Sequence, residues 1–365
     1  MKRIIYIYPL LTSYILPVFQ GMVEKGDVHL YVLYAAIPPN MGHDNYLPFT
    51  HPNVTWVQLT EAYPFGKSFG IWYSRLMRHI FQIKPDVIIT WANPRYLSYW
   101  VLLLIGRLSG IPVYSRGHGL VKKINPSLLH RLMFKTMINF STKYICYTSN
   151  VKESLEPLLK DKRKLVVDNN TLENDYPVLP DQKTGGENGI FFIGRVRPGC
   201  GVELLVQAIE HLHRKPGFDM ELHIIGDGPL GEYLQECSVK YDWFKYYGKL
   251  FDQKVISEIS HNCRFGCGPG FMGLNVVHMM SLSLPVLTHR DFSAHMGPEP
   301  IYVVHEKNGW LVDQANTLPL IENAILELWK MPVERMQLLQ TNAFRTYVEL
   351  SNPPYHIRLL SIIGL

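Results

Sequence analysis

Cysteine is scarce in this sequence, with five residues in a chain of 365. A small, odd number of cysteines in a long chain argues against a disulfide framework. Cys263 and Cys267 have a CxxxC spacing, but no second pair of metal ligands accompanies them. We therefore predict neither structural zinc nor any other metal site.

Long apolar runs are missing as well. The longest, residues 96–105, is too short to span a bilayer and is followed by Gly106 and Arg107. The first ten residues, MKRIIYIYPL, lack the apolar length and the small-residue cleavage site of a signal peptide. These absences predict a cytoplasmic protein.

Charge is modest, at 18% of residues with a net charge of +5, whereas 47% of residues are hydrophobic. This balance predicts a folded protein rather than a disordered one. It suits anionic substrates or an anionic membrane surface, but it lacks the dense basic stripe of a nucleic-acid binder, so no nucleic-acid partner is expected. The length allows two domains, each with its own core.

The most informative stretch is residues 190–236. An apolar run at 190–193 leads into the turn GRVRPGCG (194–201) and a helical pattern, and a second apolar run ends in GDGP at 226–229. This order predicts a parallel βαβ unit, with a glycine-rich turn at each helix start. Backbone N–H groups and the helix dipole favour a phosphate there, and Arg195 and Arg197 add positive charge. The alternative is that the glycines only turn the chain.

Alternating apolar and helical segments continue on both sides of this unit. In the first half we predict strands at 3–8, 28–35, 54–59, 86–90, 112–115, 144–148 and 164–167, with helices at 11–25, 68–82, 97–108 and 126–140. In the second half we predict strands at 189–193, 220–225, 244–247, 265–267, 285–288 and 310–312, a helix at 318–329, and a helical end at 333–363 broken at 352–354. The predicted fold class is α/β, with two Rossmann-like doubly wound domains.

Domain boundaries follow from composition. The polar, glycine-bearing segment DQKTGGEN at 181–188 predicts an interdomain linker. We therefore expect an N-terminal domain at 1–180, a C-terminal domain at 181–345, and a helical tail at 346–365 that packs back on the N-terminal domain.

Four segments of the second half resemble one protein family: FFIGRVRPGCGVELLVQAIEHL, ELHIIGDGPLGEYL, GFMGLNVVHMMSLSLPVLTH and NGWLV. Their order and spacing are similar to those of the C-terminal domain of GT-B-fold glycosyltransferases. The strongest likeness is to retaining family four, in the branch that builds bacterial surface polysaccharides. The likeness covers most of residues 189–315. It is weaker in the first half, at KPDVIITW, GIPVYSRGHG, YICYTSNVKESL and NNTL.

The resemblance implies a GT-B fold in which the two domains face each other across a cleft. A nucleotide-diphosphate sugar would lie mainly on the C-terminal domain, and a glycan or lipid-linked acceptor mainly on the N-terminal one. The implied reaction is a retaining glycosyl transfer without a metal cofactor, because positive side chains and a helix N-terminus take the leaving-group charge.

The resemblance also assigns candidate residues. Arg195 matches the family's donor-phosphate arginine, and His118 matches a histidine that ends an N-domain strand near the reacting sugar. We expect catalytic roles for His118 and Glu299. The expected donor-binding residues are Gly194, Arg195, Arg197, Gly201, Gly270, Phe271, Met272, Gly273, Leu274 and His278.

Three positions depart from the family pattern. Cys200 stands where a lysine is usual, and Gly270 and His278 stand where two glutamates are usual. Arg197 could replace the cation and Glu299 a carboxylate, while an imidazole nitrogen of His278 could bond a ribose hydroxyl. The alternatives are a packed helix histidine at 278 and an ordinary core or surface histidine at 118.

Two other functions stay open. The departures favour a catalytically impaired glycosyltransferase-like subunit that only binds a partner enzyme or a sugar nucleotide. A sugar-nucleotide epimerase shares this architecture, but it needs acid/base carboxylates that the sequence does not display. A serine hydrolase is disfavoured because no G-x-S-x-G turn is present.

An anionic membrane surface is a further candidate partner. Two predicted helices of the first half mix aromatic or large apolar residues with basic ones. They contribute Trp72, Tyr73, Phe81, Arg75 and Arg78 at 68–82, and Leu129, Met133, Phe134, Arg131 and Lys135 at 128–140. Such a helix can lie in the headgroup layer, which would make the protein peripheral on the inner face of the plasma membrane. The alternative is that these faces are ordinary core.

Overall fold

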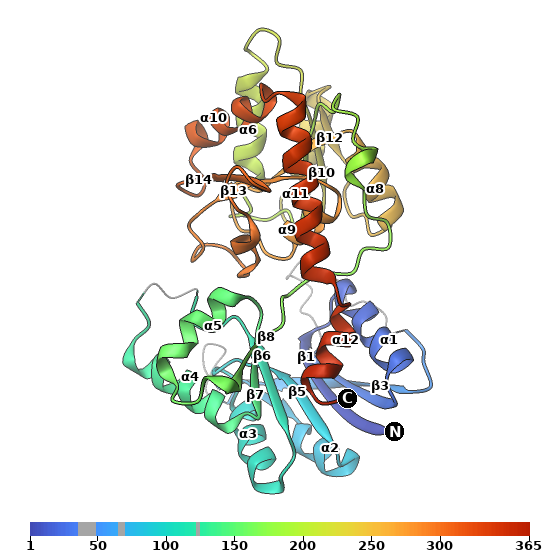
Figure 1. The fold of residues 1–365 in the computed structure, drawn as a ribbon, viewed down its shortest axis with the longest axis vertical. Helices are drawn as coiled ribbons and strands as arrows, with labels where there is room; N and C mark the ends of the chain where they lie inside the picture. The colour runs from blue at the N-terminus through green and yellow to red at the C-terminus, as the bar shows by residue number, and fades with distance from the viewer. Residues whose placement is uncertain (36–48, 65–69, 122–124) are drawn as a thin grey trace. The chain divides into compact units, whose positions relative to one another are not determined.

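The computed structural model describes residues 1–35, 49–64, 70–121 and 125–365. The chain divides into two compact units, one formed by residues 1–169 and 353–365 and the other by residues 170–352 (Figure 1). The boundaries expected from composition were 180/181 and 345/346. Each unit is an α/β domain built on a parallel sheet, as predicted.

The sheet of the first unit has the strand order β4-β3-β2-β1-β5-β6-β7-β8. All neighbours are parallel except β4, which runs antiparallel to β3. The strands are β1 (Lys2–Leu10), β2 (Val28–Ala35), β3 (Val54–Ala62), β4 (Trp72–Ser74), β5 (Val87–Trp91), β6 (Val113–Gly117), β7 (Lys143–Cys146) and β8 (Leu165–Val167).

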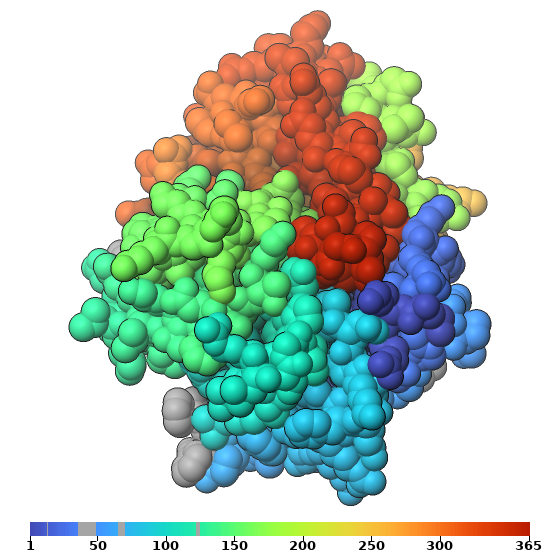
Figure 2. Space-filling view, turned by 60° about the horizontal axis from the view of Figure 1, so that its bottom comes forward, coloured from blue at the N-terminus to red at the C-terminus, as the bar shows by residue number. Residues whose placement is uncertain are grey.

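Helices cover both faces of this sheet. The α-helices are α1 (Leu16–Lys25), α2 (Leu76–Ile83), α3 (Leu97–Ser109), α4 (Leu128–Phe140), α5 (Ser149–Leu155) and α12 (Tyr355–Ile362), with short 3-10 turns at Ser13–Ile15, Glu156–Leu158 and Lys162–Lys164. Helices α2 to α5 bury their apolar side chains against one face. Helices α1 and α12 cover the other, so the C-terminal helix packs beside the N-terminal one (Figures 1 and 2).

The second unit has a six-stranded, wholly parallel sheet in the order β11-β10-β9-β12-β13-β14. The strands are β9 (Gly189–Ile193), β10 (Glu221–Ile225), β11 (Phe244–Tyr246), β12 (Cys263–Cys267), β13 (Val286–His289) and β14 (Gly309–Val312). The helices are α6 (Val202–Leu212), α7 (Gly231–Lys240), α8 (Gln253–His261), α9 (Asn275–Ser281), α10 (Leu318–Trp329) and α11 (Val333–Ser351), with 3-10 turns at Pro180–Gln182 and Glu299–Tyr302. One face packs against α6, α7 and α10, and the other against α8 and α9.

The helix predicted at 68–82 is wrong at residues 70–75, and its first two residues lie outside the described ranges. Within the described residues, Trp72–Ser74 forms β4, and Tyr73 pairs with Glu61 of β3. Arg75 then adopts a left-handed conformation with a φ of 63°, and α2 begins only at Leu76. The aromatic residues that suggested a helical face are therefore held by pairing with a strand that local periodicity does not reveal.

The linker predicted at 181–188 is instead part of the second unit. The side chain of Lys183 is buried, and its Nζ donates hydrogen bonds to the carbonyl oxygens of Ser260 (2.6 Å) and Cys263 (3.1 Å). A polar segment can thus belong to a core when its charge is satisfied by backbone carbonyls. The chain crosses between the units at 169/170 and again at 352/353.

Candidate functional site

The glycine-rich turn between β9 and α6 occupies the switch point of the second sheet. From β9 the chain runs outward through β10 and β11, and it then returns to the other side of β9 as β12. Ligands of doubly wound sheets bind at the carboxyl ends of the strands where the order reverses. Gly201 caps α6 with a left-handed φ of 81°, and no side chain caps the helix, so the positive end of α6 faces this edge.

A second loop, after β12, packs backbone to backbone against this turn. The Phe271 nitrogen donates a hydrogen bond to the Gly199 oxygen at 2.9 Å. A Cβ added to Gly270 would lie 2.6 Å from the carbonyl carbon of Cys200, and one added to Gly201 would lie 2.6 Å from the Gly270 nitrogen. Neither position tolerates a side chain, so these glycines keep the two loops in contact.

The loop after β10 closes the cluster from the other side. The Val196 nitrogen donates to the Asp227 oxygen at 3.2 Å, and a Cβ on Gly228 would lie 2.6 Å from the Val196 oxygen. A Cβ added to Gly226 would likewise overlap the carbonyl oxygen of Gly194. The glycines of GDGP therefore serve close loop packing as well as turning the chain.

The two arginines of the first turn flank the buried Val196. Both Arg195 and Arg197 are half-buried. An Arg197 guanidinium nitrogen contacts the sulfur of Met296, which holds that side chain against the loop after β13. Cys200, at the position where the resembled family usually has a lysine, is buried, and burial raises the pKa of its thiol. Among the positions of this turn, the cationic ones are thus Arg195 and Arg197.

A stacked histidine pair fixes the loop after β12. The rings of His289 and His295 lie 3.8 Å apart between centroids at an interplanar angle of 7°. His295 accepts from the Met272 nitrogen through Nδ1 (3.2 Å) and donates through Nε2 to the His289 oxygen (2.9 Å), which sets one neutral tautomer. The Nε2 of His289 donates to the Gly270 oxygen at 3.2 Å. Burial lowers the pKa of His295 to about 4, so the pair stays uncharged at neutral pH.

Glu299 lies buried beside the same loop. Its Oε1 accepts a hydrogen bond from Nδ2 of Asn170 at 2.6 Å. A Cβ added to Gly273 would lie 3.5 Å from its Oε2, and one added to Gly297 would overlap that atom. The carboxylate therefore borders the glycine loop in which the donor-binding residues were predicted.

His278 belongs to α9 and is buried, and burial lowers its pKa to about 4. Its Nε2 has no hydrogen-bond partner among the described residues. A neutral imidazole with an unused ring nitrogen can still donate to or accept from a hydroxyl. In the loop before α9, Met272 is buried with both backbone groups bonded, whereas Phe271 is exposed and Leu274 is half-buried.

His118 follows directly after β6 in the first unit, so the structure separates it by domain from the other predicted site residues. Its ring lies edge-on to Tyr147, with 4.9 Å between centroids. Arg116, two residues earlier, is fully buried: its guanidinium lies 4.7 Å from the Tyr147 ring centroid and donates to the Tyr6 hydroxyl. The base of the His118 loop is thereby anchored in a tyrosine-rich core.

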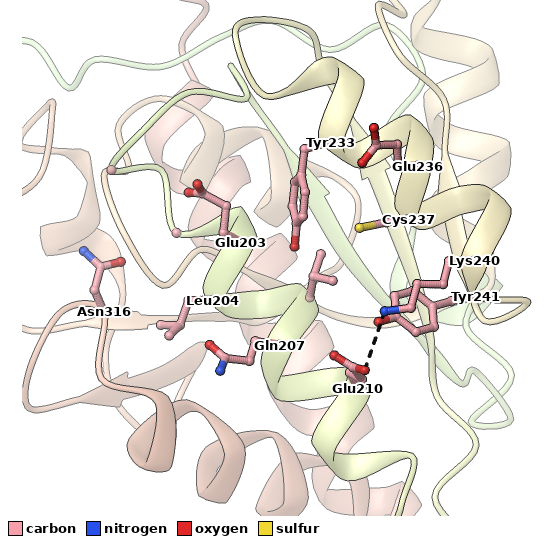
Figure 3. A pocket seen from close by; sticks show the side chains of 13 residues that line it. Glu203, Leu204, Gln207, Glu210, Tyr233, Glu236, Cys237, Lys240, Tyr241 and Asn316 are labelled. Carbon is pink, nitrogen blue, oxygen red and sulfur yellow. Dashed lines mark ion pairs between the residues drawn. The ribbon is translucent and has the colours of Figure 1, made fainter.

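A groove on the second unit is a poor place for a phosphate. It measures about 810 Å³ and lies between α6 and α7, where Glu203 and Glu210 face Glu236 and Lys240 (Figure 3). The Nζ of Lys240 lies 4.0 Å from Oε1 of Glu210. Three carboxylates against one paired lysine repel an anion, so we assign the phosphate-binding chemistry to the glycine loops and not to this groove.

Two features are absent from the described part of the chain. No three His, Cys, Asp or Glu side chains there are arranged to hold a metal ion. Within the same ranges, no helix has both the length and the apolar character to cross a bilayer.

Several solved structures share this fold. It matches the GT-B structures of sucrose-phosphate synthase from Thermosynechococcus elongatus (TM-score 0.73, 15% identity, 100% of this chain and 98% of that one) and of Anabaena HepE with UDP and glucose (0.65, 13%, 100% of both). It also matches the lipopolysaccharide outer core galactosyltransferase WaaB (0.65, 15%, 99% of both). At these identities the likeness shows the fold, which is GT-B as expected.

The likeness in sequence covers less of the chain than the likeness in fold. Residues 187–331 match the family described as Glycosyl transferases group 1. Among curated proteins, none matches the chain by sequence. The group 1 domain together with the GT-B fold indicates that this protein is a transferase.

Sequence reasoning missed four residues that shape the site: Asn170, Asn275, His289 and His295. The Nδ2 of Asn275 donates to the Ile193 oxygen (3.1 Å), and its Oδ1 accepts from the Gly273 nitrogen (2.8 Å). Asn275 thereby joins the end of β9 to the loop after β12. A signal existed for His289, because it directly follows the predicted strand at 285–288. Nothing local marks Asn170 as the partner of a glutamate 129 positions away.

Proposed function

We propose that this protein is a retaining, metal-independent glycosyltransferase of family four, which moves a sugar from a nucleoside diphosphate to a glycan acceptor. The observation that carries the proposal is the cluster of backbone-packed glycine loops at the β9/β12 switch point, with Arg195 and Arg197 at the positive end of α6. The group 1 match and the UDP and glucose bound by Anabaena HepE support it.

Each residue then has a chemical task. Arg195 and Arg197 would pair with the diphosphate and stabilise the charge that develops on it when the glycosidic bond breaks. Glu299, held by Asn170, would accept hydrogen bonds from donor-sugar hydroxyls. Nε2 of His278 would bond a ribose hydroxyl, and His118 would contact a sugar.

Arg195→Ala tests the donor site. The loss of a charge-assisted contact to diphosphate should weaken UDP binding by about 1.5–3 kcal/mol. UDP titration of the full chain by calorimetry measures this, with Arg214→Ala as the matched control, because Arg214 is an exposed arginine of the same unit that pairs with Glu210. Unchanged UDP affinity in Arg195→Ala would place the diphosphate elsewhere.

A binding-only subunit is the second candidate, favoured by the buried thiol of Cys200 where the family has a lysine. The two candidates differ in turnover. A transferase releases UDP from UDP-sugars in the presence of candidate acceptors and preserves the anomeric configuration of the product. A binding subunit takes up UDP-sugar without any release of UDP.

We also propose that the acceptor is lipid-linked, that the protein acts in bacterial surface polysaccharide synthesis, and that α4 docks on the anionic inner face of the plasma membrane. Leu128, Leu129 and Leu132 of α4 are 82%, 64% and 57% exposed, beside Arg131 and Lys135. Large exposed apolar residues with basic neighbours suit the headgroup layer. The name of WaaB, a lipopolysaccharide galactosyltransferase, supports the pathway. Helix α2 contributes less than expected, because Trp72 and Tyr73 belong to β4.

Vesicle co-sedimentation tests the docking. We expect binding to anionic vesicles that weakens with salt and weakens further in Lys135→Glu, because each basic residue near anionic lipid contributes about 1 kcal/mol. Leu129→Ser should reduce binding at every salt concentration. Failure to bind anionic vesicles at low salt would leave the acceptor soluble or transiently presented.

A further inference from the structure

The segment 170–174 brings the chain into the second unit, directly after the crossing at 169/170. It belongs to no helix or strand, yet Thr171, Leu172 and Asn174 are each 8% exposed or less. Buried backbone without regular structure needs hydrogen-bond partners for its polar groups. The partners of this segment lie on three elements of the second unit, two of which carry candidate site residues.

Asn170, at the start of the segment, bonds a buried carboxylate. Its Nδ2 donates to Oε1 of Glu299 at 2.6 Å, and Glu299 is 2% exposed. Glu299 begins the 3-10 turn Glu299–Tyr302, and a Cβ added to Gly297 would overlap its Oε2. The carboxylate is thus confined by an amide at one oxygen and by backbone at the other. A hydrogen bond to a charged group is among the strong ones, so it fixes the orientation of this carboxylate.

Helix α11 anchors the segment. The hydroxyl oxygens of Thr171 and Ser351 lie 2.8 Å apart, and the Asn174 nitrogen donates to the Tyr347 hydroxyl at 3.2 Å. The Leu172 side chain belongs to the apolar core that α9 and α11 share. These ties to one long helix leave the start of the segment little freedom to move.

The same segment reaches α9, which carries His278. Nδ2 of Asn174 donates to Oγ of Ser281 at 2.8 Å, and that hydroxyl donates to the His278 oxygen at 2.7 Å. A few residues further on, the Val178 nitrogen donates to the Ser281 oxygen at 3.1 Å. One stretch of chain therefore supports both Glu299 and the turn of α9 that contains His278, the two residues that could stand in for the paired glutamates of the resembled family.

We propose that the segment 170–174 positions the donor-sugar contacts, with Asn170 as the residue that orients Glu299. Asn170 acts through Glu299, because its amide keeps the carboxylate in the orientation in which it accepts hydrogen bonds from sugar hydroxyls. Asn174 keeps the segment and α9 in register. The assignment rests on the proposed transfer function and goes beyond it, because it makes a residue at the domain crossing necessary for turnover.

Asn170→Ala and Asn170→Asp test the amide, since the first removes it and the second keeps its shape without the N–H donor. The assay measures release of nucleoside diphosphate from a panel of UDP- and GDP-sugars, with and without candidate glycan acceptors. Each variant should lower kcat/KM about tenfold, as expected when a hydrogen bond to a charged group is lost. The matched control is Asn352→Asp, because Asn352 is an exposed asparagine at the other crossing, and its kcat/KM should be that of the wild type.

Two readouts separate positioning from a merely structural role. Free nucleoside diphosphate has no sugar, so its calorimetric affinity should be unchanged in both Asn170 variants. In the double variant Asn170→Ala/Glu299→Gln, kcat/KM should match that of Glu299→Gln alone, because no carboxylate is left for Asn170 to orient. If Asn170→Ala no longer binds nucleoside diphosphate, the same comparison is made with Asn170→Asp, which preserves the side-chain volume.

The outcomes distinguish this assignment from the proposed function. Losses that multiply in the double variant, or a normal kcat/KM in the Asn170 variants, overturn the assignment, while transfer by the wild-type chain leaves the proposed function standing. Normal turnover in both Asn170→Ala and Glu299→Gln removes Glu299 from the site and overturns the assignment as well. No transfer by the wild-type chain from any donor of the panel overturns the proposed function, and this assignment with it.

Discussion

His278 is expected to make the second unit sensitive to acid. Its folded-state pKa is about 4, lowered by burial from an ordinary value of 6.5. Between these two values the unfolded chain binds a proton that the folded chain excludes, so stability falls as the pH falls through this window. From pH 7.5 to pH 5.0 the loss is about 2 kcal/mol for this one group, from the proton-binding polynomials of the two states.

The perturbation is His278→Leu, which removes the titrating group while keeping an apolar side chain of similar size. Hydrogen exchange of β9 peptides at pH 7.5 and 5.0 reads the opening free energy of the second unit, once intrinsic exchange rates are corrected. The variant should lose about 2 kcal/mol less than the wild type over this interval. His295, whose pKa burial also lowers to about 4, should account for a similar share in the wild type.

A matched control is His305→Gln, because His305 is an exposed histidine of the same unit. Absolute stability at pH 7.5 does not decide the question, since a Leu side chain packs differently from a His side chain at this position. The difference between the two pH values does. Parallel losses in His278→Leu and the wild type would show that His278 is protonated in the folded state, or is not buried as the structure has it.

Three further predictions concern the loops and the domain crossing. Gly270→Ala should abolish the UDP-induced rise in melting temperature, because the added Cβ would lie 2.6 Å from a carbonyl carbon of the first glycine turn. The control is Gly186→Ala, whose Cβ would meet only one side-chain atom, at 3.7 Å, and this variant should behave as the wild type. Arg358→Met should destabilise α12 by about 3–5 kcal/mol, because the buried Asp168 carboxylate would lose the guanidinium that lies 2.8 Å away. Limited proteolysis should then cut the variant within residues 353–365, and adding Asp168→Asn should restore protection. Glu299→Gln should lower transfer by about 10²-fold with a far smaller change in melting temperature, and near-normal turnover would shift the donor contact to another residue.

Much of the fold could be read from local patterns. The strands β2 and β9 and the helix α10 have the predicted bounds, because continuous apolar runs and a clear 3.6-residue period are bounded by glycine, proline or polar residues. The alternation of these elements led to two parallel α/β domains. The glycine-rich turns at strand ends then led to the loops that the structure brings together at the β9/β12 edge.

Long-range pairing decided what those patterns could not. Trp72 and Tyr73 look like part of a helix until their ladder with β3 is known, and Lys183 looks like linker until two carbonyls are found around its ammonium group. In both cases the stabilising partner lies at least ten residues away in the chain, where local periodicity carries no information.

The sequence by itself determined which loops meet at the edge of each sheet, because parallel strands with right-handed crossovers leave few places for the turns that follow them. Only the tertiary structure decided which side chains act together there. Asn170 reaches Glu299, and Tyr96 reaches Glu61, across 129 and 35 positions. Such contacts depend on the packing of whole elements, and a hydrogen bond between distant residues leaves no periodic trace in a single sequence.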